Sequence, residues 1–138
     1  MPQAQNQTVN WMLSVAPVYR WAISLTFVAI VVALSISPGI ARPGDSIFVW
    51  LIANTATPVQ KTMHVAVYAV LAFLWVWTLQ SIESKSLRFS LAFLIAASLG
   101  GLLEWQQTRV PGRYGTIADL LLNLVGTLIG MLIALLIL

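Results

Sequence analysis

The stretch EWQQTRVPGRYGTIADLLLN, residues 104–123, interrupts a chain that is otherwise strongly apolar. The whole sequence has seven Lys and Arg and four Asp and Glu residues, yet four of these charges fall within this stretch: Glu104, Arg109, Arg113 and Asp119. Long apolar runs flank it on both sides. This concentration of charge indicates either a solvated loop between membrane helices or a polar site that faces the interior of a helix bundle.

The composition is that of an integral membrane protein. Of 138 residues, 59% are apolar and 8% are charged, whereas soluble domains have roughly 45–50% and about 25%. The length leaves room for one domain, residues 1–138. The net charge of +3 comes with no basic stripe and no interleaving of aromatic and basic residues, so we expect no nucleic-acid partner. The chain has no cysteine, which excludes thiolate catalysis and cysteine-ligated metal.

Four apolar segments are each long enough to cross a bilayer, which takes roughly 17–25 residues. They cover residues 21–37, 63–80, 87–105 and 116–138. Because an even number of spans returns the chain to its starting side, both termini are expected on one side of the membrane. The first segment also resembles a signal peptide, with Ala33 and Ser35 as small residues near its end. We favour a span because the residues before it carry little charge.

The linker between the first two spans contains a shorter apolar run. Residues 45–54, DSIFVWLIAN, are too few to cross the membrane, and Asp45 is placed to cap a helix. The linker on either side is rich in proline and glycine. The sequence therefore predicts an all-α bundle of four transmembrane helices with a short interfacial helix between helices one and two.

Basic residues are spread almost evenly over the two sides of this topology. The side of the termini carries Arg20, Lys85 and Arg88, and the opposite side carries Arg42, Lys61, Arg109 and Arg113. If Lys61 and the two arginines of residues 104–123 are held in a site, they no longer report on topology. The remaining residues then favour cytoplasmic termini.

Six polar residues lie at ends of spans that antiparallel alternation brings into one leaflet. They are Lys61 and His64 at the start of the second span, Glu104 and Gln107 at the end of the third, and Asp119 and Asn123 at the start of the fourth. Spacing by three or four residues also places Tyr68 on the face of Lys61 and His64. Because an ionised group near the membrane centre costs roughly 2.5–3.5 kcal/mol on insertion scales, we expect these side chains to pair or to lie near the interface.

Glycines continue the polar face of the fourth span. Gly126 and Gly130 follow Asn123 at helical spacing and form a GxxxG pattern, which lets a neighbouring helix approach closely. Gly100 and Gly101 allow similar contact one turn before Glu104. The pattern is compatible with packing inside the bundle and with a homo-oligomer formed through Gly126 and Gly130.

Each polar residue taken alone also has a purely structural interpretation. A histidine in the first turn of a span is often an interfacial anchor. Asp119 at a helix start is typical of an N-terminal cap or a partner of the helix dipole, with Thr116 as a competing cap. The Pro-Gly-Arg sequence is an ordinary turn. Their convergence in one leaflet of a small protein favours a site.

Two segments together resemble the VanZ-like family. They are QKTMHVAVY at residues 60–68 and EWQQTRVPGRYGTIADLLLNLVGTLIG at residues 104–130. That family has Lys-x-x-His at the start of one span, followed by Glu-x-x-Gln, a Pro-Gly-Arg turn and Asp-x-x-x-Asn-x-x-Gly-x-x-x-Gly. By position, its polar residues fall on Lys61, His64, Glu104, Gln107, Arg113, Asp119 and Asn123. Many relatives have Asp before the lysine, where this chain has Gln60, so any role of that carboxylate is absent here or filled by Asp45 or Asp119.

The resemblance implies a small multi-pass protein of the bacterial inner membrane that is linked to the cell envelope. The family is named after a member associated with resistance to teicoplanin, a glycopeptide antibiotic with a lipid tail, and relatives also occur with exopolysaccharide machinery. The implied partners are membrane lipids and a lipid-linked or glycan envelope substrate.

Three functions fit the polar residues. In an intramembrane enzyme, Glu104, Asp119 and His64 would supply acid–base catalysis for hydrolysis or transfer. The substrate would then be bound by Lys61, Gln107, Arg113, Asn123 and Tyr68. We expect no cofactor, with a divalent ion held by Glu104, Asp119 and His64 as the alternative.

In a binding protein, Arg113 and Lys61 would hold a phosphate, a sugar or an amphiphilic drug. In a transporter, four spans would be few for a transport path unless the protein forms an oligomer, and no internal inverted repeat is evident. A cluster that only locks the bundle is the structural alternative.

Overall fold

The computed structural model describes residues 11–138 and contains four helices long and apolar enough to cross a membrane. They are α2 (Pro17–Ile36), α4 (Thr57–Thr78), α5 (Lys85–Gln107) and α6 (Ile117–Ile137). A single 3-10 turn, η1 (Leu79–Ser81), extends α4, and the short helix α3 (Ile47–Ala53) follows α2. The predicted all-α bundle with a short helix between its first two spans is confirmed. Part of the N-terminal flank used to weigh the signal-peptide alternative, residues 1–10, lies outside the described residues.

Local sequence signals set the starts of the long helices. Pro17 and Pro58 lie in the first turns of α2 and α4, where the missing amide proton costs no helical hydrogen bond. Ser84 caps α5 by accepting a hydrogen bond from the Leu87 amide at 3.3 Å. The helices α2 and α4 begin before the predicted spans at 21–37 and 63–80, because the prolines add a less apolar first turn to each helix.

The predicted cap of the short helix is wrong by one residue. Ser46, not Asp45, caps α3, since its hydroxyl accepts a hydrogen bond from the Val49 amide at 3.3 Å. The Asp45 carboxylate instead accepts from the Arg42 amide at 2.7 Å. Asp45 thereby closes the turn before the helix, which is the alternative use of an Asp side chain in a loop.

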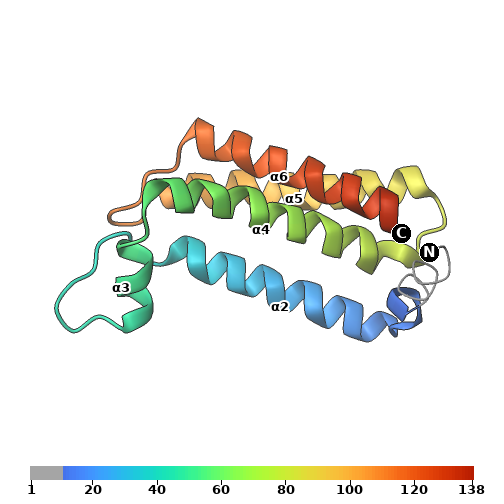
Figure 1. Ribbon diagram of the computed structural model, residues 1–138, viewed down its shortest axis with the longest axis horizontal. Helices are drawn as coiled ribbons and strands as arrows, with labels where there is room; N and C mark the ends of the chain where they lie inside the picture. Colours follow the sequence, from blue (N-terminus) through green and yellow to red (C-terminus); the bar gives the residue numbers. More distant parts are fainter. Residues whose placement is uncertain (1–10) are drawn as a thin grey trace, which may run out of the picture.

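The central helix of the bundle is α4. Of its most apolar window 44% is buried, against 22% for α2, 22% for α5 and 28% for α6. In Figure 1 it runs between α2 and α6, with α5 behind, and α3 lies at the end opposite to the start of α2 and the end of α6. The start of α2 and the end of α6 therefore lie at the same end of the bundle, as an even number of spans predicts.

The closest helix contact joins α4 and α6 through the glycine pair. A Cβ atom at Gly126 would lie 3.0 Å from Cα of Val65, and one at Gly130 would lie 2.9 Å from Cα of Ala69. Both glycines are buried against α4 of the same chain. The structure thus uses the GxxxG pattern inside the bundle, and a homo-oligomer through these glycines stays a prediction.

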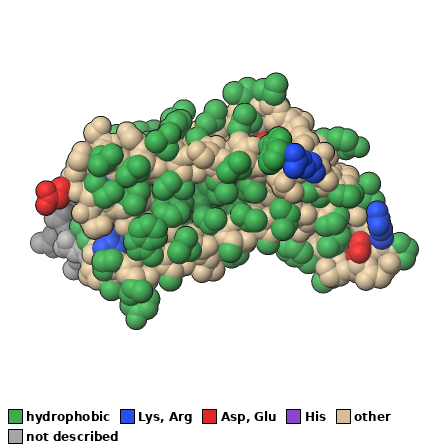
Figure 2. Space-filling model, turned by 180° about the vertical axis from the view of Figure 1, so that it is seen from behind, with side chains coloured by type: hydrophobic (Ala, Val, Ile, Leu, Met, Phe, Trp, Pro, Cys, Tyr) green, Lys and Arg blue, Asp and Glu red, His purple; other side chains and the backbone are tan. Residues whose placement is uncertain are grey.

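The outer surface of the bundle is apolar over most of its length. Figure 2 shows hydrophobic side chains across the middle of one face, while the charged side chains visible there gather toward its two ends. Large apolar side chains on α2 and α6, among them Leu25, Ile30, Leu128 and Leu132, are exposed. Exposed apolar surface on this scale requires a lipid environment, so the chain is a multi-pass membrane protein.

Candidate functional site

A chain of polar contacts joins three helices near the end of the bundle that carries α3. On α4, Nδ1 of His64 lies 2.8 Å from Oδ1 of Asn123 on α6. The Nδ2 group of Asn123 donates to Oε1 of Glu104 on α5 at 3.2 Å. Nδ1 of His64 also lies 3.6 Å from that carboxylate oxygen. Asn123 and Glu104 are buried, and His64 is 18% exposed.

With Glu104 ionised, the hydrogen-bond pattern sets the tautomer of His64. An ionised carboxylate only accepts hydrogen bonds, so the Asn123 amide then turns its NH₂ group toward Glu104 and its oxygen toward His64. That oxygen also only accepts, and Nδ1 of the imidazole therefore carries the proton. In the neutral ring, Nε2 is left with a free lone pair for a ligand or a proton.

The second carboxylate oxygen of Glu104 faces the start of the next helix. Its Oε2 accepts a hydrogen bond from the Thr116 amide at 3.3 Å, next to the N-terminus of α6. A negative charge is stabilised at this position by the helix dipole. Gly115 is needed here, because a Cβ atom would lie 3.0 Å from the carbonyl carbon of Glu104. The turn is therefore packed directly onto the residue that supplies the carboxylate.

The Pro-Gly-Arg turn carries Arg113 to the end of α2. Gly112 has a φ of 74°, which only glycine adopts readily, and Gly39 donates its amide to the carbonyl of Pro111 at 3.0 Å. The Arg113 guanidinium then donates to the Leu34 carbonyl at 3.0 Å and to the Ser37 carbonyl at 3.1 Å. Burial lowers the pKa of Arg113, an effect that the charge of Glu104 opposes. The side chain stays a cation, as arginine does in proteins.

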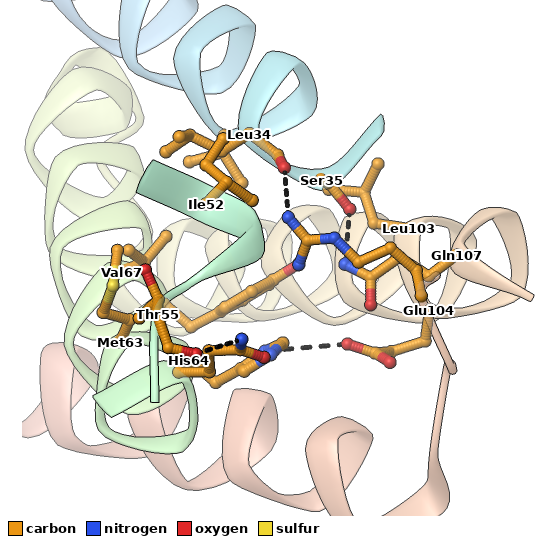
Figure 3. Close-up of a pocket in the computed structure, with 14 residues that line it drawn as sticks. Leu34, Ser35, Ile52, Thr55, Met63, His64, Val67, Leu103, Glu104 and Gln107 are labelled. Carbon is orange, nitrogen blue, oxygen red and sulfur yellow. Dashed lines mark hydrogen bonds and ion pairs between the residues drawn. The ribbon is translucent and has the colours of Figure 1, made fainter. Parts of the chain in front are cut away.

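These groups border a cavity of about 110 Å³. The polar part of its lining consists of His64, Glu104, Gln107 and Arg113 together with Ser35, Thr55, Gln60 and Tyr68. Apolar side chains from α2, α3, α4 and α5 form the rest, namely Val31, Leu34, Ile52, Met63, Val67 and Leu103. Figure 3 shows His64 and Glu104 on one side, Gln107 with Ser35 on another, and Ile52 of α3 above them. The cavity is amphipathic, with a charged end and an apolar wall.

The structure brings together six of the eight predicted site residues. Five of them line the cavity, which are His64, Tyr68, Glu104, Gln107 and Arg113, and Asn123 bridges two of these. Tyr68 is buried and also lies beside Gly100 of α5.

Lys61 and Asp119 lie at the same end of the bundle but outside the cavity lining. The Lys61 side chain is exposed. The Asp119 carboxylate accepts from the Thr116 hydroxyl at 2.6 Å, and the Asp119 amide donates back to that hydroxyl at 3.0 Å. Thr116 is thus the cap of α6, and Asp119 acts in the capping turn. Within residues 11–138, no group of three His, Cys, Asp or Glu residues could hold a metal ion.

Of the three basic residues set aside when the two sides of the membrane were compared, only Arg113 lies in the site. Arg113 is withdrawn into the cavity lining, but Lys61 is exposed, and Arg109 stacks on the Trp105 ring at 3.9 Å as an exposed cation. These two residues still count in the comparison of the two sides. The cytoplasmic position of the termini therefore stays a prediction.

Sequence reasoning missed the contribution of α2 to the site. The buried hydroxyl of Ser35 accepts a hydrogen bond from Nε2 of Gln107 at 2.8 Å, and two carbonyls at the end of α2 bind Arg113. The sequence held one signal, since Ser24 and Ser35 are polar residues in an apolar run and both are buried. Backbone carbonyls carry no sequence signal at all.

These observations define a class of protein: a multi-pass membrane protein whose four-helix bundle holds a buried polar cluster beside an amphipathic cavity. The VanZ/LLP1 family model matches residues 3–138, and the chain belongs to this family. Neither a curated protein nor a solved structure matches the chain.

Proposed function

We propose that the cavity is the active site of an intramembrane acid–base enzyme that hydrolyses or transfers a lipid-linked or glycan substrate of the cell envelope. One observation carries the proposal. Nδ1 of His64 is held by Asn123 and Glu104, while the same ring borders the cavity. A carboxylate that orients an imidazole and stabilises its protonated form is the arrangement that makes histidine an effective general base.

The proposed reaction uses both nitrogens of this ring. Nε2 of His64 removes a proton from the attacking oxygen, which belongs to water in hydrolysis and to a substrate hydroxyl in transfer. That oxygen forms a bond to the electrophilic centre while the bond to the leaving group breaks. The imidazolium then returns its proton to the leaving group. Glu104, whose Oε1 lies 3.6 Å from Nδ1, stabilises the imidazolium while it exists. Once the proton has passed to the leaving group, His64 is neutral again and the cycle is complete.

The cavity lining supports an amphiphilic, anionic substrate. Arg113 supplies a cation beside the acid–base pair, and guanidinium groups bind phosphate and carboxylate well. The apolar wall suits an acyl or prenyl chain. α3 contributes Ile52 to this wall and exposes Ile47 and Trp50 on its outside, as expected of a helix in the lipid interface.

We place the enzyme in the bacterial inner membrane with cytoplasmic termini, so the cavity faces the outer leaflet. Family membership supports a role at the cell envelope, because the member that gives the family its name is associated with teicoplanin resistance. In that position the cavity would meet envelope precursors after they cross the membrane.

The test is conversion of a bacterial envelope-lipid extract by the purified protein in detergent micelles, followed by mass spectrometry of the products. His64→Gln and Glu104→Gln should each lower the rate about 10²- to 10⁴-fold, the usual contribution of acid–base catalysis. Arg109→Gln is the matched control, because it removes an exposed charge at the same end of the bundle. Full activity of His64→Gln, in a variant with wild-type thermal stability, would refute the mechanism.

A second candidate is non-catalytic binding of a lipid head group or a lipidated glycopeptide. The half-buried Arg113, held at the end of α2, favours it because a fixed cation in an amphipathic cavity is a head-group site without any chemistry. Arg113→Gln would then abolish lipid binding, His64→Gln would leave it unchanged, and no product would form on long incubation.

A further inference from the structure

A second polar cluster lies at the opposite end of the bundle, where α2 begins and α4 ends. Arg20 is only 7% exposed, although it is in the first turn of α2. Its Nη1 group donates to the Trp77 carbonyl and to Oε1 of Gln80, both at 3.3 Å. These bonds are long for N–H···O contacts, which cluster near 2.9–3.0 Å. Among residues 11–138 no carboxylate forms an ion pair with Arg20.

Two hydrogen-bond donors of the Arg20–Gln80 pair have no acceptor. They are Nε of Arg20 and Nε2 of Gln80, and each is buried without a partner in the described part of the chain. The two side chains are in direct contact through Nη1 of Arg20 and Oε1 of Gln80. Every unpaired group here is a donor. The chemistry that the cluster lacks is therefore an acceptor, and beside a buried cation a negatively charged oxygen is the best one.

The position of the cluster points to the source of such an oxygen. It lies where α2 begins and α4 ends, at the end of the bundle opposite to α3 and the cavity. The ends of membrane-spanning helices are where lipid head groups are met. Trp21 packs edge-on against Trp75 with ring centroids 5.6 Å apart, and Trp21 is partly exposed. Tryptophan at this depth is typical of the lipid–water interface. Basic pockets between transmembrane helices bind the head groups of anionic lipids.

We propose that this cluster, formed by Arg20 and Gln80, binds the phosphate of an anionic membrane lipid. The guanidinium neutralises the phosphate, and Nε of Arg20 and the Gln80 amide supply hydrogen bonds to its oxygens. The exposed Trp21 lies beside the acyl chains. The site is separate from the cavity with His64 and Glu104, and it is independent of the function proposed for that cavity.

The proposal is tested with the full chain in detergent micelles doped with phosphatidylglycerol, using native mass spectrometry to count bound lipid and thermal unfolding to measure protection. Arg20→Gln should weaken phosphatidylglycerol binding by about tenfold, since it removes a charge-assisted contact. Lys85→Gln is the matched control, because it removes an exposed cation at the same end of the bundle and should change the affinity by less than about twofold.

Gln80→Glu keeps the test decisive if Arg20→Gln fails to fold. A carboxylate at position 80 pairs with Arg20 inside the protein, so the variant should be at least as stable as the wild type and yet lose phosphatidylglycerol binding. If Arg20 only caps the end of α4, Gln80→Glu will bind lipid as the wild type does, and the proposal is overturned.

Two further arms identify the ligand. Diacylglycerol with the same acyl chains lacks the phosphate and should neither bind at this stoichiometry nor protect the protein. Equal protection by diacylglycerol would overturn the phosphate assignment. Inorganic phosphate should protect far less than the lipid at equal concentration, and equal protection would overturn the assignment to a lipid.

Discussion

Replacing Gly130 by alanine should force α4 and α6 apart. The new Cβ atom would clash first with the carbonyl oxygen of Ala69, and it would lie 2.7 Å from the carbonyl carbon and 2.9 Å from the Cα of the same residue. Ordinary contact begins at 3.4 Å, so α6 must retreat from the α4 backbone by at least about 0.7 Å. Overpacking of this kind costs about 1–3 kcal/mol. The better helix propensity of alanine returns about 1 kcal/mol, which leaves a net destabilisation of about 0–2 kcal/mol.

Gly101→Ala is the matched control for this prediction. No heavy atom lies within 4 Å of a Cβ built at Gly101, so the same methyl group should be neutral or stabilise the protein by up to about 1 kcal/mol. Reversible unfolding of both variants in mixed detergent micelles gives the comparison. Because His64 and Asn123 sit on the two helices that separate, Gly130→Ala should also lengthen their 2.8 Å contact and shift the imidazole NMR signals. Equal stability of the two variants would refute the close contact of α4 and α6.

Two further substitutions test the supports of the site. Ser35→Ala leaves the buried Gln107 amide without its acceptor and should lower the unfolding free energy by about 1–3 kcal/mol. The double variant Ser35→Ala/Gln107→Met should regain most of this stability, as measured by thermal unfolding. A double variant no more stable than Ser35→Ala would contradict the assigned hydrogen bond. Thr116→Val removes the cap of α6 and should cost about 1 kcal/mol, whereas Thr116→Ser should be close to wild type. Equal melting temperatures of these two variants would show that the cap contributes nothing.

The fold was predictable because the length and hydropathy of each successive segment decide whether it enters a membrane. Apolar runs of sufficient length predict the spans, and an even number of spans places both termini at one end. The helix starts were less predictable, since hydropathy does not register the less apolar first turns that Pro17 and Pro58 begin. Ser46 and Asp45 are both good caps, and only the turn at residues 42–45 decides between them.

The candidate site was predictable at the level of the leaflet. Span order alone placed His64, Glu104 and Asn123 at one end of the bundle, and the structure joins them by hydrogen bonds. Span order could not separate Asp119 from Asn123, which are four residues apart on one helix. The distinction is a matter of rotation and depth: Asn123 lies where α6 packs on its neighbours, and Asp119 lies in the capping turn.

Segment length and hydropathy are enough to identify a four-span membrane bundle with its scarce polar residues gathered in one leaflet, because these two properties control which segments enter a bilayer. Which of those polar residues contact one another depends on how the helices pack. Three features of the two sites depend on helix rotation and on distances between segments far apart in the chain. They are the contact of His64 with Asn123, the hydrogen bonds from Arg113 to carbonyls of α2, and the unpaired donors of Arg20 and Gln80. Backbone carbonyls and buried, partnerless donors have no sequence signature, and these groups set the chemistry proposed for both ends of the bundle.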